Sequence, residues 1–306
     1  MIVNSGQAGL DRATQGIRAL LADPDSITNE YKLARQLGAF VESGGASEDY
    51  IWLDEFPEMK IWIDEKEAES PRGNALHIKN VDYAATLVVH KNDIADDKTG
   101  TLTTRFRSAY EDANRHYLEG IFDLMAKAFT QDCYDGQKFI DTDHPGPNGT
   151  TWSNKQSGAL SESNLNAAIA MLMKIPNRHG KPVGAQPTHL IVSPDDRATA
   201  LAILAQYGPA GASNVNAGLL TPVITARLTP GAWFVGDFSR VLKPYIVQVR
   251  SPVALVEQDP GSMEGGPTSG PMSESRFMRG ILRFGFEART GFGFGLPQLI
   301  VGSTGS

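Results

Sequence analysis

One short segment carries most of the side chains that could do chemistry: CYDGQKFIDTDHPG, from Cys133 to Gly146. It holds the single cysteine of the chain together with three aspartates and a histidine. All five are potential metal ligands or acid/base groups. Asp141, Asp143 and His144 could supply two carboxylates and an imidazole to a metal ion, which would suit a metal-dependent hydrolase.

The spacing of these residues nevertheless favours a structural role. Neither HExxH nor CxxC occurs, and His144-Pro145 stands where a calcium loop needs a third oxygen ligand. Aspartates beside glycine and proline commonly bond their own backbone in turns. We therefore expect a hydrogen-bonded turn with no metal or cofactor, and keep a hydrolase using Asp141, Asp143 and His144 as an alternative. The other histidines show no paired spacing: His77, His90, His116, His179 and His189.

Two further motifs could also suggest chemistry. Cys133 follows an apolar helical pattern, where a lone cysteine is usually a small buried hydrophobe, and no partner for a nucleophile is evident. The run GFGFG at Gly291–Gly295 is followed by a strand-like segment, whereas a phosphate-binding loop must open a helix. Its alternation puts Phe292 and Phe294 on one face and the glycines on the other, where another backbone can approach. We predict no catalytic or cofactor-binding residues.

Composition limits the class of protein. At 306 residues, with 41% hydrophobic and 21% charged side chains, the chain resembles ordinary soluble globular proteins. No apolar run approaches the ~18 residues of a membrane helix, and the first residues do not resemble a secretory signal. One cysteine suggests assembly in a reducing cytoplasm. A net charge of −7 excludes a protein that grips nucleic acid through its overall charge.

A long helix is the clearest predicted element. Apolar residues recur at steps of three and four over residues 101–130, which predicts a helix about 45 Å long. Asp96, Asp97 and Thr99 precede it as N-cap candidates. A helix of this length suits a scaffold more than a small enzyme. The apolar stripe consists of Leu102, Phe106, Ala109, Tyr110, Ala113, Tyr117, Ile121, Leu124 and Ala128.

The segments on either side of this helix predict an α+β protein with projecting parts. Helical patches at 13–22 and 29–40 lack enough apolar residues for a core of their own, so they form an arm. Residues 50–95 read as a long hairpin with the polar tip Asp64–Asn74. Helices and strands alternate afterwards. Helices are predicted at 162–175 and 195–207, and strands at 189–193, 219–225, 232–238, 245–250 and 253–258.

The hairpin combines aromatic and charged residues. Aromatic side chains could stack nucleic-acid bases, but the many acidic neighbours in this segment would repel phosphate. Because tryptophans are favoured at the buried centres of interfaces, contact with another protein is the better interpretation. We predict contact with another protein through Trp52, Phe56, Trp62, Lys66 and Arg72.

These segments, in this order, resemble a known family. WLDEFPEMKIWIDE, then VHKNDIADDKTG, the long helix and FTQDCYDGQKFIDTDHPG are similar to the major head subunits of Mu-like phages. These are major capsid proteins with the HK97-like fold. The resemblance is continuous from about Leu37 to Pro145. GDFS and RFGFEARTGFGFGLPQLIVG, nearer the C-terminus, resemble the general pattern of such proteins.

The resemblance implies a division into five segments. Residues 1–47 would be an N-terminal arm. Residues 48–98 would be an extended hairpin loop, or E-loop, which implies that the protein contacted by its aromatic and charged residues is a neighbouring subunit. Residues 99–155 would form a peripheral domain with the long spine helix. Residues 156–274 would form an axial domain, and 275–306 would return to the peripheral domain. An arm, a hairpin and an over-long helix are also what a shell subunit needs, because each projection can bury its apolar side on a neighbour.

The function implied by the resemblance is structural. Hexamers and pentamers would form an icosahedral head that encloses phage DNA without sequence-specific contact. The protein would reside in the virion after assembly in the host cytoplasm. A scaffolding protein or protease and a portal would be its partners, and a decoration protein is a further candidate partner. An encapsulin-like nanocompartment shell is the alternative with the same fold. The best-known member of this fold crosslinks a lysine to an asparagine. Lys60, Lys66 and Asn74 are present, but no accompanying catalytic glutamate is evident, so we predict no crosslink.

Overall fold

The structure is a computed structural model, and its contacts divide the chain into two compact units. The first comprises residues 1–33, 80–118 and 249–290, and the second 34–79, 119–248 and 291–306. The structure describes residues 28–50, 76–90, 92–93, 101–177, 179–205, 214–257 and 278–306. The predicted division into five segments stays a prediction.

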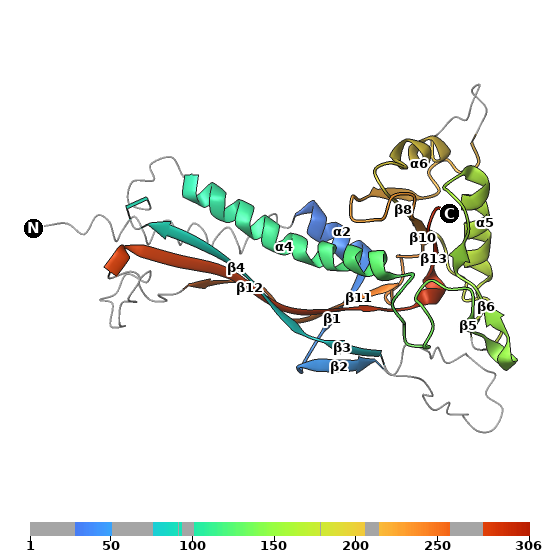
Figure 1. Cartoon of the computed structure of the whole chain (residues 1–306), viewed down its shortest axis with the longest axis horizontal. Coiled ribbons are helices and arrows are strands. Elements are labelled where there is room, and N and C mark those ends of the chain that lie inside the picture. The colour runs from blue at the N-terminus through green and yellow to red at the C-terminus, as the bar shows by residue number, and fades with distance from the viewer. Residues whose placement is uncertain are drawn as a thin grey trace, which may run out of the picture. The chain divides into compact units, whose positions relative to one another are not determined.

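Helices and strands alternate in the manner of an α+β protein, as predicted (Figure 1). The α-helices are α2 (Asn29–Leu37), α4 (Thr101–Lys127), α5 (Glu162–Lys174) and α6 (Arg197–Ile203). The strands are β1 (Gly38–Glu42), β2 (Ser47–Tyr50), β3 (Leu76–Lys79), β4 (Val81–His90), β5 (His144–Pro145), β6 (Thr151–Trp152), β7 (Lys155–Gln156), β8 (His189–Val192), β9 (Thr221–Ile224), β10 (Trp233–Gly236), β11 (Tyr245–Glu257), β12 (Ile281–Phe294) and β13 (Ile300–Ser303). Short 3₁₀ turns lie at η3 (Pro147–Gly149) and η5 (Pro297–Leu299).

The long helix is confirmed as α4, which ends three residues before the predicted end. The predicted N-cap candidates Asp96, Asp97 and Thr99 lie outside the described residues. Among the helices that the structure describes, none combines the length and apolar character needed to cross a membrane.

A four-stranded sheet has the order β1-β11-β12-β4. Strand β12 pairs antiparallel with β4 from Ile281 opposite His90 to Thr290 opposite Val81. Burial alternates along β12, so that Phe284 and Phe286 are buried while Arg283 and Glu287 are exposed. This is the pattern of a sheet with one covered face.

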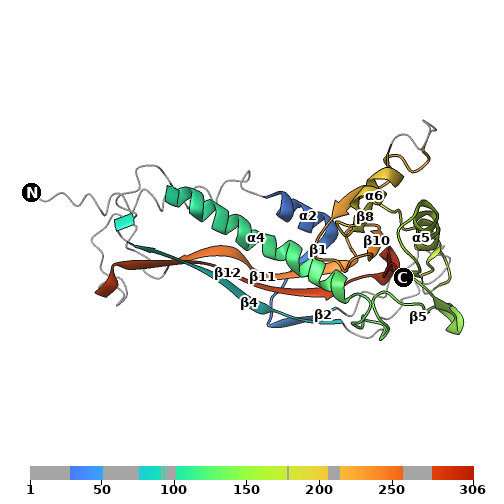
Figure 2. The same ribbon diagram turned by 45° about the horizontal axis from the view of Figure 1, so that its top comes forward.

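Helix α4 packs on the covered face of this sheet. It runs along the sheet in both views (Figures 1 and 2). The ring of Phe106 meets that of Phe284 edge-on, with 4.9 Å between centroids. Val89, Leu102 and Leu282 complete this small core. Most of the predicted apolar stripe is buried, whereas Ala109, Tyr110 and Ala113 are half-buried. The helix also buries Leu118, Phe122 and Met125, which the predicted stripe did not include.

The second unit contains a five-stranded sheet in the order β7-β13-β10-β8-β9. Trp233, Phe234 and Val235 of β10 are fully buried. Leu165 and Leu172 of α5 are equally buried and belong to the same core. Ser161 caps this helix by accepting a hydrogen bond from the Asn164 N–H, which satisfies one of its free N-terminal donors.

Four predicted elements differ clearly from the observed ones. The predicted helix at 29–40 ends at Leu37, because Gly38 begins β1. A Cβ at Gly38 would lie 2.9 Å from the Val247 side chain, so β1 approaches its neighbours too closely for a larger residue. The strands predicted at 245–250 and 253–258 form one strand, β11. The helix predicted at 195–207 is the shorter α6.

The interpretation of the glycine-phenylalanine run is confirmed. Phe294 stacks on Phe139 with 4.2 Å between ring centroids. On the other side of the strand, a Cβ at Gly293 would lie 2.4 Å from the Ile78 side chain. A Cβ at Gly295 would lie 2.2 Å from the Lys243 carbonyl oxygen, so another backbone does approach closely here.

Candidate functional site

The segment CYDGQKFIDTDHPG forms the loop between α4 and the two-stranded β5–β6 ladder. It begins with a tight turn in which the Cys133 N–H donates to the Gln137 carbonyl over 2.8 Å. Gly136, at the tip, has a φ of 83°, a conformation that glycine adopts without strain. This reversal of the chain places Asp135 close to His144.

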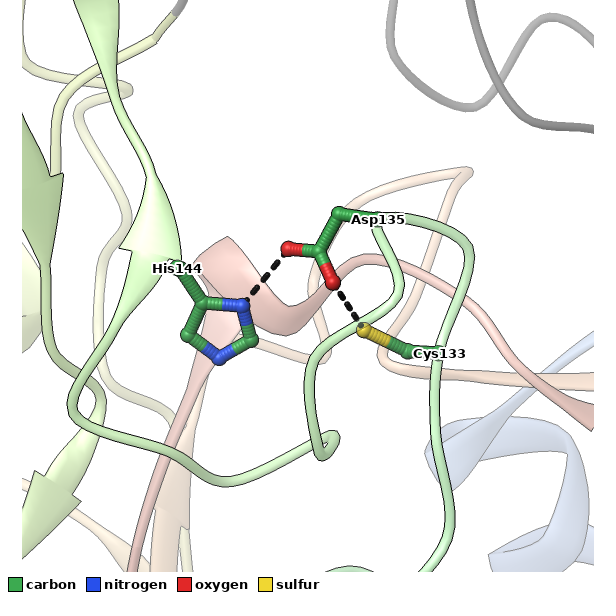
Figure 3. A group of neighbouring side chains, drawn as sticks. All are labelled: Cys133, Asp135 and His144. Carbon is green, nitrogen blue, oxygen red and sulfur yellow. Dashed lines mark hydrogen bonds and ion pairs between the residues drawn. The ribbon is translucent and has the colours of Figure 1, made fainter. Parts of the chain in front are cut away.

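Three side chains of this loop meet in a buried cluster (Figure 3). The Cys133 thiol donates to Oδ1 of Asp135 over 3.0 Å. His144 Nδ1 lies 2.7 Å from Oδ2 of the same carboxylate. The Asp135 side chain is 8% exposed and that of His144 is fully buried. The side chains of Asp135 and His144 are therefore shielded from solvent.

Burial, charge and hydrogen bonds together set the protonation states of the carboxyl and the thiol. Burial alone would raise the pKa of Asp135, but hydrogen bonds from His144, Cys133 and the Gln137 N–H lower that pKa overall. Burial, with the Asp135 charge beside it, raises the pKa of the Cys133 thiol well above its usual range. Cys133 is thus a protonated donor, and it lacks the thiolate character that a nucleophile or a metal ligand needs.

The cluster has the ligand types of a zinc site, since a sulfur, a carboxylate oxygen and an imidazole nitrogen lie within 4.8 Å of one another. Each of these atoms already has a hydrogen-bonding partner inside the cluster. A metal ion would have to displace the thiol proton and the proton between His144 and Asp135. The donor set therefore fits a hydrogen-bonded turn better than a metal centre.

The structure does not assemble the predicted trio of Asp141, Asp143 and His144. The Asp141 carboxylate accepts from the N–H groups of Lys138 and Thr142, which is the turn chemistry expected from the sequence. Asp143 is exposed. The hydrolase alternative that used these three residues therefore has no support.

Sequence reasoning missed the two residues that hold His144. One is Asp135, and the other is Asn154, whose Oδ1 lies 3.1 Å from His144 Nε2. The Asp135-Gly136 pair is a turn signal that could have indicated a chain reversal. Residues nine and ten positions from His144 show no periodic spacing, however, so only the folded loop reveals the contacts.

The predicted contact residues Trp52, Phe56, Trp62, Lys66 and Arg72 lie outside the described residues. The strands that flank this stretch are described. Strand β2 pairs antiparallel with β3, with Tyr50 opposite Leu76. Tyr50 and Leu76 are thus neighbours across this ladder, and the predicted hairpin contacts stay a prediction.

Comparison with known proteins gives a consistent relationship along the chain. The major capsid protein of Escherichia phage Mu is 32% identical over 110 residues, which cover 36% of this chain and 36% of that protein. The Mu-like prophage FluMu major head subunit of Haemophilus influenzae is 27% identical over 267 residues, covering 86% and 63% of the two chains. The chain thus spans less than two thirds of the length of these curated relatives.

Solved structures show the same fold at low sequence identity. The procapsid of bacteriophage JBD30 has a TM-score of 0.54 at 23% identity, covering 94% of this chain and 75% of that one. The native GTA particle capsid has a TM-score of 0.52 at 15% identity, covering 90% of each chain. These likenesses confirm the predicted HK97-like capsid fold.

A family model described as "Mu-like prophage major head subunit gpT" matches residues 25–162, 150–228 and 224–306. These matches join without a gap from residue 25 to residue 306, so the relationship extends over both units. The chain therefore belongs to the Mu-like gpT family of phage major head subunits.

Proposed function

We propose that copies of this chain assemble into the closed shell of a phage head. The observation that carries the proposal is the family match, which extends from residue 25 to residue 306. This is a family of structural head subunits and not of enzymes. The same match favours a phage head over a cellular nanocompartment.

The finer proposal is an icosahedral shell of hexamers and pentamers that encloses DNA. A net charge of −7 suits a wall that contains DNA without binding it tightly through its overall charge. The subunit would be a component of the virion and would assemble in the host cytoplasm. A scaffolding protein or protease, a portal and a decoration protein are the partners that such assembly would use.

Contacts between subunits would come from the hairpin loop. In this proposal Trp52, Phe56 and Trp62 supply apolar anchors, and Lys66 and Arg72 supply charged contacts near the tip. Interfaces of about 1,600 Å², repeated around each subunit, would give strong collective stability from moderate individual contacts. The five-segment division into arm, hairpin, peripheral domain, axial domain and return segment belongs to this proposal.

The test is expression of the chain with and without a scaffolding protein, followed by electron microscopy. Wild-type protein should give closed shells. Deletion of Asp64–Asn74 should leave a folded, soluble subunit that forms none. A second variant replaces Asp64–Asn74 by a Gly/Ser segment of the same length, which keeps the loop length and removes the side-chain contacts. This variant should also form no closed shells. Normal particles from the deletion variant would contradict the proposed role of the hairpin.

We also propose that the shell holds together without covalent crosslinks. Denaturing electrophoresis of mature particles should show one subunit band. A ladder of covalent multimers would contradict this, and alanine replacement of Lys60, Lys66 and Asn74 in turn would then identify the partners.

A further inference from the structure

His144 is fully buried and lies between two polar side chains on opposite sides of its ring. Asp135 faces Nδ1 at 2.7 Å, and Asn154 faces Nε2 at 3.1 Å. The ring also stacks on the indole of Trp152, with 4.3 Å between centroids and 15° between planes. Each nitrogen therefore has one close partner, and the nature of those partners determines where the protons are.

The Asn154 side chain can present only its oxygen to His144. Its Nδ2 donates to the carbonyls of Phe139 and Pro297, over 2.9 and 3.1 Å. Its Oδ1 accepts from the Asp141 N–H over 2.9 Å. Reversing the amide would place an NH₂ group against that N–H and leave two carbonyls facing an oxygen. Since Oδ1 is an acceptor, His144 Nε2 must carry a proton.

The Asp135 side chain is an acceptor on the opposite side. Its Oδ1 already accepts from the Cys133 thiol and from the Gln137 N–H, each over 3.0 Å. These two donors favour the ionised carboxylate. A carboxyl group also has a lower ordinary pKa, about 3.9, than an imidazole, about 6.5, so the proton between Oδ2 and Nδ1 belongs to the ring. A carboxylate has no proton to give, so Nδ1 must also be the donor in its bond to Oδ2.

We infer that His144 is a buried imidazolium, held by the Asp135 carboxylate and the Asn154 amide oxygen as a charged clamp inside the protein. The face of Trp152 is a suitable surface for a cation. Asp135 is the one acidic group that bonds the ring among the described residues. Other charged groups of the loop point elsewhere: Asp141 bonds N–H groups of its own loop, and Lys138 pairs with Asp132 at the surface.

The clamp joins the loop after α4 to the C-terminal segment, in which Pro297 is 143 residues away from Asn154 in sequence. Through Asp135 it holds the turn after α4, and through Asn154 it reaches the C-terminal segment. Asn154 bonds the carbonyl of Pro297 through its side chain, and its own carbonyl accepts from the Gly302 N–H over 3.0 Å. Loss of the charge would therefore loosen the loop and the C-terminal segment together. This inference concerns contacts within one subunit and does not depend on the proposed function.

Nuclear magnetic resonance of the full chain with ¹⁵N-labelled histidine tests the charge directly. At neutral pH both ring nitrogens of His144 should carry a proton, and the signal is assigned by its absence from His144→Gln. A neutral ring with a single N–H in the wild-type spectrum would overturn the inference. This measurement needs only the wild-type fold, with the variant serving for assignment.

Hydrogen exchange tests whether the charge works as a clamp. In Asp135→Asn, the backbone N–H groups of Asn154 and Gly302 should exchange faster by at least about tenfold, because removing one partner of a buried pair leaves the other uncompensated. The matched control is Asp141→Asn, which makes the same chemical change in the same loop without touching the ring, and there His144 should stay doubly protonated. Unchanged exchange in Asp135→Asn would refute the clamp even if the ring is charged.

Discussion

Replacement of Gly295 by alanine should destabilise the second unit strongly. A Cβ at this position would lie 2.2 Å from the Lys243 carbonyl oxygen, about 1 Å inside an ordinary contact. The oxygen belongs to the backbone and cannot rotate away. The Gly295 N–H also donates to the Pro244 carbonyl over 2.7 Å, which holds the two segments together. Overpacking costs about 1–3 kcal/mol and a weakened hydrogen bond about 0.5–1.5 kcal/mol, so the expected loss is about 2–4 kcal/mol.

Urea unfolding of the purified subunit measures this loss. With a slope of about 3 kcal/mol per molar urea, the midpoint should fall by about 0.7–1.3 M. Gly285→Ala is the matched control, because its Cβ would meet the Ala85 carbonyl oxygen at 3.4 Å and Thr86 Oγ1 at 4.0 Å, which are ordinary contacts. The control should be neutral or slightly stabilising. Equal urea midpoints for the two variants would show that the Lys243 carbonyl does not prevent a side chain at position 295.

Four further results are expected. Gly120→Ala should lower the urea midpoint, because its Cβ would lie 2.4 Å from the Phe292 ring and this overlap outweighs the helix preference for alanine; an unchanged midpoint would contradict the packing. Burial lowers the pKa of His116 to about 4, so stability should fall as pH drops from about 6.5 to about 4, and His116→Gln should lose that dependence in thermal unfolding. The pKa of Asp135 is also lowered, so its contribution is present above about pH 4 and lost as pH falls further; the difference in urea midpoint between wild type and Asp135→Asn should shrink between about pH 6 and about pH 3. Because the pKa of the Cys133 thiol is raised, zinc or EDTA should leave the thermal midpoint unchanged, and a zinc-dependent rise would revive the metal site.

The elements predicted best from the sequence are those with a long, regular pattern. The stripe from Leu102 to Ala128 predicted α4 within three residues, because its spacing repeats over seven turns. Strand β12 alternates just as clearly, and the close approach expected at the glycines near its end is present. These features depend on neighbours in sequence, which is why a local pattern reveals them.

Features set by distant contacts were not predictable. Strand β1 begins at Gly38, where Val247 and Ile121 leave no room for a Cβ, although the sequence pattern around it continued a helix. In the loop after α4, the sequence indicated a turn but singled out the wrong aspartates. Asp135 and Asn154 hold His144 only once the loop has folded back, and nothing in their spacing indicates this.

The position of β13 in its sheet has a consequence for the timing of folding. This strand lies between β7 and β10, and all four of its residues are buried. Residues 300–303 leave the ribosome after every other strand of that sheet, so the sheet cannot close while they are still being made. A polypeptide that stops short of them lacks an interior strand, and the backbone N–H and C=O groups of β10 that pair with β13 are left unpaired.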